Sequence, residues 1–419
     1  MTSTAVQTSA GGTFRTRGQP AALDAIAGML RGGMPHALLL IGPTGVGKTT
    51  LADDIAAGLL CRFDDPAVRP CGACRACRAL AHGNHPDLHR LGPTGAGAVI
   101  PIGGREERGV RDLVRDLSLM PVEGGARVAI ITAADRMTED AQSAFLKTLE
   151  EPPAGTVLIL TAADEERLLP TIRSRTVRIR LGSVARPAVE AVLVDGGLAD
   201  AALAARLARL ASGRPGDAVA LARAPEAVTI RAEVGRTLLD LATATRTDRL
   251  RVAKDLLART GALLAVLRVA SGAEGVVAPR ATRGRGKGRA ASAAVAGTAP
   301  AGPGVGSSDA SSDEGDPAAP DLAAGGPAAR VPAAERRAAA LALVAIWRDV
   351  ARDLALVRLG QSADVRQLEL LDDLETTAGR LPEAFAVRQL RRLDLAGERL
   401  EGNVSPELVI DALAIGWSR

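Results

Sequence analysis

One motif, Gly42-Pro-Thr-Gly-Val-Gly-Lys-Thr49, constrains the fold of this chain more than any other feature. The preceding residues, Ala37–Ile41, form an unbroken apolar run, which is typical of a strand buried on both faces of a parallel sheet. The following residues, Thr49–Leu60, carry apolar side chains at helical spacing. A glycine-rich turn between a buried strand and a helix predicts an α/β fold with a phosphate-binding loop (P-loop).

The residue types in this loop match the chemistry of phosphate binding. Gly42, Gly45 and Gly47 allow backbone N–H groups to turn toward an anion at the positive end of a helix dipole. Lys48 would reach the β- and γ-phosphates of a nucleotide, and the Thr49 hydroxyl would contact Mg²⁺. A chance match is the alternative, since the chain contains 45 glycines, but the flanking strand and helix disfavour it. We therefore expect nucleotide binding here, either present or ancestral.

A cysteine cluster follows the P-loop helix. The chain contains four cysteines, which are Cys61, Cys71, Cys74 and Cys77. Close spacing of cysteines in an intracellular chain favours metal binding over disulfides. Four thiolates can converge on one tetrahedral Zn²⁺, and a site with four protein ligands is structural rather than catalytic. His82, His85 and His89 lie nearby and are alternative ligands.

Composition excludes some classes of function. The chain has 419 residues, enough for two or three domains, and no uncharged apolar run of about 18 residues, so we expect no membrane span. Met1–Gly12 has no apolar segment of the secretory type, so we expect a cytoplasmic protein. Four Phe, two Trp and no Tyr disfavour a protein that stacks on single-stranded bases. Any nucleic-acid contact would be to phosphates.

The pattern along the chain predicts several segments. After a flexible tail at 1–13, residues 14–181 alternate strand-like runs with helical patterns, as in an α/β sheet domain. The expected strands are Ala37–Ile41, Asp87–Leu91, Val128–Ile131, Val157–Leu160 and Val177–Ile179. Helical patterns cover 182–224, 225–270 and 333–419, with Trp347 and Trp417 as expected packing anchors. The Gly/Ala/Pro-rich segment 271–332 is expected to be disordered.

Four sequence features together resemble one family. The features are Pro35–Thr50, the cysteine module at 61–77, the stretch Ala144-Phe-Leu-Lys-Thr-Leu-Glu-Glu-Pro-Pro153, and Ile172-Arg-Ser-Arg-Thr176, in that order. They resemble bacterial clamp-loader subunits of the AAA+ class, the delta-prime and gamma/tau families of DNA polymerase III. The resemblance covers about residues 14–225 specifically and the C-terminal helices only in outline.

The resemblance implies an architecture and a set of partners. Residues 14–181 would be the AAA+ sheet domain, 182–224 a helical lid, and 225–270 with 333–419 an all-α collar for oligomerisation. Partners would be gamma/tau and delta subunits in a five-subunit ring that uses ATP to place a sliding clamp on primed DNA. The nucleotide-binding residues would be Gly42, Pro43, Thr44, Gly45, Val46, Gly47, Lys48, Thr49, Thr50 and the sensor residue Thr161.

The hydrolysis machinery departs from the family pattern. Catalytic members carry Asp-Glu after the third strand, to bind Mg²⁺ and activate the attacking water. Here Thr132-Ala133 follows the run Arg127–Ile131, so both carboxylates are missing. Asp135 is not expected to replace them, because a helix should begin there. The lid has Gly216 where catalytic relatives have an arginine, although Arg214 is a possible substitute. The pattern resembles delta-prime, the stator of the loader, rather than an ATPase subunit.

Arg175 is the expected catalytic contribution of such a stator. In the family, the arginine of the Ser-Arg-Cys motif reaches into the neighbouring subunit as an arginine finger; here the motif reads Ser174-Arg175-Thr176. The alternative is a basic surface run, including Arg173 and Arg178, that touches DNA phosphates. Two rival functions remain: a gamma/tau-type ATPase motor, and a scaffold with a relic P-loop. Binding of ATP without hydrolysis is the intermediate interpretation.

Overall fold

The sheet domain follows the predicted alternation of strands and helices. The structure, a computed structural model, describes residues 13–94, 98–104, 107–123, 125–271, 331–382, 384–402 and 404–417. Five strands form one parallel sheet: Ala37–Ile41 (β1), Leu88–Leu91 (β2), Arg127–Ile131 (β3), Thr156–Ala162 (β4) and Val177–Arg180 (β5). Their order across the sheet is β2-β3-β4-β1-β5. The predicted α/β fold with a parallel sheet is confirmed, and the five expected strands are present with slightly different ends.

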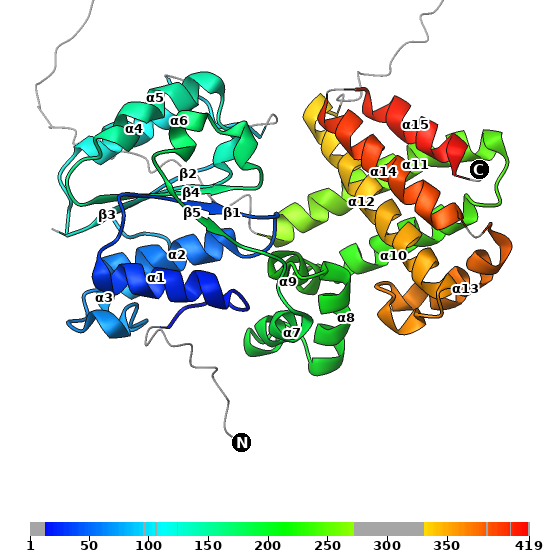
Figure 1. Cartoon of the computed structure of the whole chain (residues 1–419), viewed down its shortest axis with the longest axis horizontal. Coiled ribbons are helices and arrows are strands. Elements are labelled where there is room, and N and C mark those ends of the chain that lie inside the picture. Colours follow the sequence, from blue (N-terminus) through cyan, green and yellow to red (C-terminus); the bar gives the residue numbers. More distant parts are fainter. Residues whose placement is uncertain are drawn as a thin grey trace, which may run out of the picture. The chain divides into compact units, whose positions relative to one another are not determined.

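Helices cover both faces of the sheet (Figure 1). The helices of this domain are Pro20–Gly32 (α1), Lys48–Leu60 (α2), Arg75–Ala81 (α3), Val110–Ser118 (α4), Glu139–Glu150 (α5) and Pro170–Arg173 (α6). Leu38 and Leu40 of β1 belong to the apolar core that contains Ile55 of α2. Leu39 belongs to the core on the other face, which contains Phe145 of α5. Alternate residues of β1 thus face opposite layers, which explains the unbroken apolar run.

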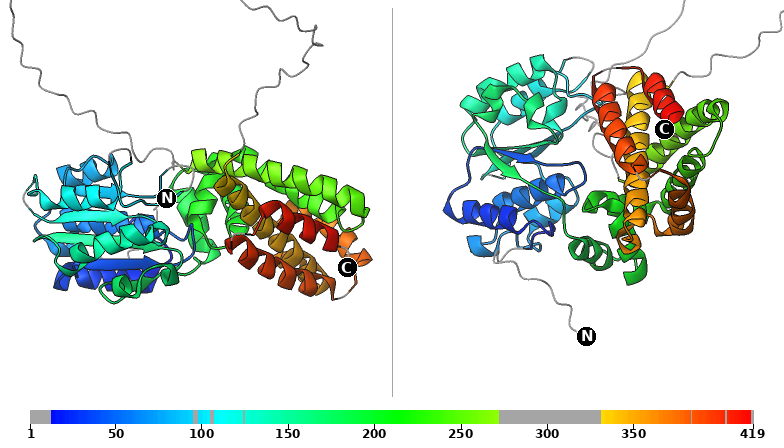
Figure 2. Two further views of the ribbon diagram at one scale, coloured as in Figure 1. Left: turned by 90° about the horizontal axis from the view of Figure 1, so that it is seen from above. Right: turned by 45° about the vertical axis from the view of Figure 1, so that its right-hand side comes forward.

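The remainder of the described chain is helical. The helices are Arg186–Asp195 (α7), Ala201–Ala211 (α8), Pro215–Arg223 (α9), Pro225–Asp240 (α10), Arg246–Ala270 (α11), Ala333–Arg358 (α12), Leu371–Arg380 (α13), Phe385–Glu401 (α14) and Pro406–Gly416 (α15). Helices α11, α12, α14 and α15 lie side by side although the 272–330 segment separates α11 from α12 in the sequence (Figure 2). None of the helices in the described ranges combines the length and apolar character that a membrane crossing requires.

Two tryptophans anchor the helical core, as the sequence predicts. Trp347 and Trp417 are almost completely buried, and their ring centroids lie 5.1 Å apart in an edge-on arrangement. Phe385 contacts Trp417 at the same centroid distance, 5.1 Å. The indole N–H of Trp417 donates to the carbonyl of Leu238 at 2.9 Å, so this polar group is satisfied inside the core. The expected tail and the 271–332 insertion lie, except for edge residues, outside the described residues.

Candidate functional site

The P-loop connects β1 to α2 at the carboxyl edge of the sheet. Gly45 has a φ of +84° and Gly47 a φ of +104°, conformations that favour glycine. A Cβ atom at Gly45 would also lie 2.6 Å from a carboxylate oxygen of Asp217. In an open parallel sheet, ligands bind outside the carboxyl ends of the strands, and the ends of β3 and β4 meet the loop here.

A pocket of about 760 Å³ lies against the P-loop. Of the predicted nucleotide-contact residues, it is lined by Thr44, Gly45, Val46, Gly47, Lys48, Thr49, Thr50 and Thr161. Gly42 and Pro43 are not among the lining residues; their carbonyls accept hydrogen bonds from Nζ of Lys48 at 2.6 and 2.8 Å. Burial lowers the pKa of Lys48, and the carboxylate of Asp135 partly opposes that shift. The structure therefore gathers most of the predicted set around one cavity.

The ends of β3 and β4 complete the floor of this pocket. Thr132 and Ala133 line it where catalytic relatives would carry carboxylates. Ala133 has a φ of +51°, and its N–H donates to Oγ1 of Thr161 at 3.0 Å. A helix was expected to begin at Asp135; instead Ala134–Arg136 forms a single 3-10 turn and α5 begins at Glu139. Thr138 caps α5 by accepting from the N–H of Ala141, which places the helix start later in the chain.

The start of α9 contacts the P-loop through backbone atoms. The N–H of Gly216 donates to the carbonyl of Gly45 at 2.8 Å, and a Cβ at Gly216 would lie 3.1 Å from that oxygen. Arg214, which the sequence offered as a substitute for an arginine at position 216, pairs with Asp217 at 3.0 Å and is not among the residues that line the pocket. The position of Gly216 thus favours close backbone approach over a charged side chain.

Arg175 lies in the turn between α6 and β5. Its guanidinium forms an ion pair with Glu150 at 2.6 Å, and another of its nitrogens donates to the carbonyl of Thr171 at 3.1 Å. The side chain is 36% exposed. Its position near the surface is compatible with contact to a neighbouring molecule. Glu150 was not singled out in the sequence, although it belongs to the motif Ala144–Pro153.

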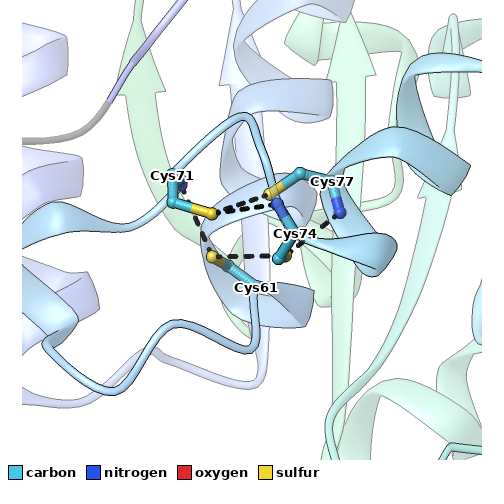
Figure 3. A group of neighbouring side chains, drawn as sticks. All are labelled: Cys61, Cys71, Cys74 and Cys77. Atoms are coloured by element: carbon cyan, nitrogen blue, oxygen red, sulfur yellow. Dashed lines mark hydrogen bonds between the residues drawn. The ribbon is translucent and has the colours of Figure 1, made fainter.

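The four cysteine sulfurs converge, as Figure 3 shows. Their sulfurs all lie within 4.8 Å of one another; Cys61 and Cys74 are 3.9 Å apart, and Cys71 and Cys77 are 4.0 Å apart. Zn–S bonds of about 2.3 Å in a tetrahedron place sulfurs about 3.8 Å apart, close to these separations. No histidine belongs to this group among the described residues, which disfavours the alternative ligands. The four cysteines can hold one metal ion.

Backbone N–H groups surround the sulfurs. Those of Cys71, Cys74 and Cys77 each donate to a preceding cysteine sulfur at 3.4 Å. Burial opposes ionisation of Cys74, but backbone and side-chain hydrogen bonds prevail and lower its pKa to about 6. Burial raises the pKa of Cys61 and that of Cys77. Donors aimed at sulfur favour the thiolate form that a metal requires.

One part of the pocket at the P-loop was missed in the sequence. Arg15, Thr16 and Arg17 line it, and a buried carboxylate holds this N-terminal segment in place. Asp54 of α2 accepts from the backbone N–H of Arg15 at 3.0 Å and of Thr16 at 2.8 Å, and from the Thr16 hydroxyl at 2.7 Å. An acidic residue within the apolar pattern of α2 is the signal that would have indicated such an anchor.

Comparisons with known proteins show which family this chain resembles. A family model described as "DNA polymerase III, delta subunit" matches residues 18–185. The delta-prime subunit of Pseudomonas aeruginosa is 44% identical over 143 residues, which cover 34% of this chain and 42% of that protein. The delta-prime subunit of Escherichia coli is 37% identical over 190 residues, covering 44% and 54%. The chain resembles delta-prime clamp-loader subunits. The resemblance inferred from the motifs is therefore confirmed.

The similarity extends to gamma/tau-type subunits. The tau subunit of Escherichia coli is 33% identical over 210 residues, which cover 49% of this chain and 31% of that protein. The chain spans about half the length of the two delta-prime relatives. The comparisons thus support a clamp-loader subunit of DNA polymerase III, of a type shared by delta-prime and tau.

Proposed function

We propose that this chain is the delta-prime subunit, the stator, of a DNA polymerase III clamp loader. It helps to load a sliding clamp onto primed DNA in the cytoplasm, together with gamma/tau and delta subunits. Contact with DNA would be through the phosphate backbone. Residues 182–224 serve as the lid, and 225–270 with 333–419 as the collar through which subunits assemble.

The absence of carboxylates at the end of β3 is the observation that favours a delta-prime subunit over a motor subunit. Thr132 and Ala133 line the nucleotide pocket, and neither can activate a water for attack on a phosphate. The P-loop is nevertheless formed, with Lys48 and Thr49 at the pocket. This combination supports nucleotide binding without efficient hydrolysis by the chain itself.

Arg175 is proposed to act in trans on a neighbouring ATPase subunit. A guanidinium at the γ-phosphate stabilises the charge that develops during phosphoryl transfer. The side chain of Arg175 is tied to Glu150 by an ion pair between partly exposed groups, which can be exchanged at small cost. The four cysteines are proposed to bind structural Zn²⁺, since a site with four protein ligands has no open position for catalysis.

ATP turnover in reconstituted complexes tests this function. We expect no turnover by the chain alone, and turnover when gamma/tau, delta, clamp and primed DNA are added. Arg175→Ala should lower turnover of the complex by about a thousandfold or more. Arg178→Ala is the matched control, because Arg178 is an exposed arginine of the same basic run that pairs with Glu165 at 3.7 Å.

Each result separates the proposed function from its rivals. Robust turnover by the chain alone, abolished by Lys48→Ala, would identify a motor subunit. Equal, salt-sensitive losses with Arg175→Ala and Arg178→Ala would indicate a DNA-contacting surface rather than a finger. Failure to assemble with gamma/tau and delta would exclude a clamp-loader role.

A further inference from the structure

We propose that Asp135 positions the divalent cation of a nucleotide held by the P-loop, in place of a carboxylate at the end of β3. This inference rests on the proposed occupation of the pocket by a nucleotide. It revises the expectation from sequence, in which a helix beginning at Asp135 would keep this residue from replacing the missing carboxylates.

The backbone after β3 turns Asp135 back toward the P-loop. Ala133 adopts a left-handed conformation, and its hydrogen bond to Thr161 fixes the turn against β4. The N–H groups of Arg136 and Met137 donate to the carbonyls of Ala133 and Ala134 at 2.8 and 3.0 Å, which closes the 3-10 turn. As a result Asp135 lines the same pocket as Lys48 and Thr49.

One carboxylate oxygen of Asp135 lacks a partner. Its Oδ1 atom is buried and accepts no hydrogen bond from any described residue. A buried polar atom of this kind costs free energy unless a ligand or water satisfies it. The nearby charge of Lys48 interacts with this carboxylate but leaves Oδ1 without a hydrogen bond, and a cation in the pocket would give that oxygen a partner.

The charges around the pocket single out this residue. Among the described lining residues, Asp135 is the one acid, and the basic residues are Arg15, Arg17, Lys48, Arg136 and Arg223. The basic groups suit the phosphates of a nucleotide. A Mg²⁺ ion needs one or two carboxylates in addition to phosphate oxygens and water. Within this lining, Asp135 is the available carboxylate, and the Thr49 hydroxyl is the second protein ligand expected of a P-loop.

Such a site would hold Mg²⁺ with the nucleotide but would not activate water. Ala133, which has no acid–base group, stands where a catalytic relative would carry the water-activating carboxylate. The metal would therefore strengthen binding of the triphosphate without promoting its hydrolysis.

Equilibrium binding of ATP to the full chain, measured with Mg²⁺ and with excess chelator, tests the role of Asp135. Mg²⁺ should tighten binding to the unmodified chain. Asp135→Asn should reduce this gain by about tenfold, the worth of one contact to a charged group, while affinity without Mg²⁺ is kept or increased. Asp135→Glu should retain most of the gain. Asp140→Asn is the matched control, because Asp140 is an exposed acid of α5 outside the pocket.

The outcomes are distinct. If Mg²⁺ tightens ATP binding to Asp135→Asn as much as to the unmodified chain, and thermal unfolding is unchanged, the role of Asp135 is overturned while nucleotide binding stands. No ATP binding by the unmodified chain would overturn both nucleotide occupation and this inference, while Arg175 could still act in trans. If Asp135→Asn fails to fold, Asp135→Ser is measured instead: an undiminished effect of Mg²⁺ on ATP affinity would overturn the proposal, and an effect reduced by about tenfold would support it.

Discussion

At the scale of single residues, the ion pair with Glu150 restrains the guanidinium of Arg175, the proposed arginine finger. The guanidinium lies 2.6 Å from the carboxylate, and both side chains are at least a third exposed. Arg175 also donates to Thr171, so two contacts within the same chain hold it when no neighbour is present. To reach a phosphate in another subunit, the guanidinium must exchange or share its contact with Glu150.

Glu150→Gln tests this restraint. Loss of the charge should make Arg175 easier to recruit and raise turnover of the assembled complex by up to about fivefold, the equivalent of an exposed pair worth at most about 1 kcal/mol. Turnover of the reconstituted complex at limiting chain concentration is the measurement. Glu151→Gln, at an adjacent exposed position, should leave turnover unchanged. A decrease with Glu150→Gln would mean that the pair positions the finger productively.

At the scale of elements, a buried carboxylate joins α12 to the segment that leads into α13. Asp353 is completely buried; it accepts from the N–H groups of Arg366 and Gln367 at 3.0 and 3.2 Å and pairs with Arg352 at 3.0 Å. Asp349, one turn earlier on α12, pairs with both Arg231 and Arg366. These contacts connect three segments of the helical core that are distant in sequence.

Asp353→Ala should destabilise the helical core by about 3 kcal/mol, because two N–H groups inside it lose their acceptor. Urea unfolding followed by tryptophan fluorescence measures the change, since Trp347 lies on the same helix. Asp394→Ala is the control: Asp394 forms an exposed ion pair with Arg348 at 2.5 Å, worth at most about 1 kcal/mol. Equal effects of the two substitutions would show that the buried network contributes no more than a surface pair.

At the scale of the whole molecule, the cores are separate. The two cores of the sheet domain comprise residues between Phe14 and Leu181, and the helical core comprises residues from Val184 to Trp417. The four-cysteine cluster lies in the sheet domain, whereas the two tryptophans of the chain lie in the helical core. Tryptophan fluorescence therefore reports unfolding of the helical core, whereas removal of a metal from the cysteine cluster would act on the sheet domain.

Removal of metal should destabilise the sheet domain selectively. With a zinc chelator present, we expect the thermal transition of the sheet domain to move to lower temperature in calorimetry, because the four-cysteine segment loses its cross-link. The transition reported by tryptophan fluorescence should stay within about 1 °C, since that signal comes from the other core. Equal shifts in both signals would show that the two parts unfold as one cooperative unit.

The local features of this protein follow from short stretches of its sequence. The P-loop, the strands of the sheet and the cysteine cluster were predictable because each depends on residues close together in the chain: an apolar run, a glycine-rich turn, a Cys-x-x-Cys-x-x-Cys spacing. The tryptophan anchors followed from their place in apolar helical patterns. The family resemblance came from motifs of the same local kind.

Contacts between side chains that are distant in the sequence became apparent only in the folded structure. Asp135 reaches the P-loop because the turn at Ala133 is fixed by Thr161 of a different strand. The N-terminal segment lines the pocket because Asp54 of α2 holds it, and Arg175 is restrained by an acid on α5. Such pairings depend on strand order and helix packing, which bring together segments whose spacing in sequence carries no local signal.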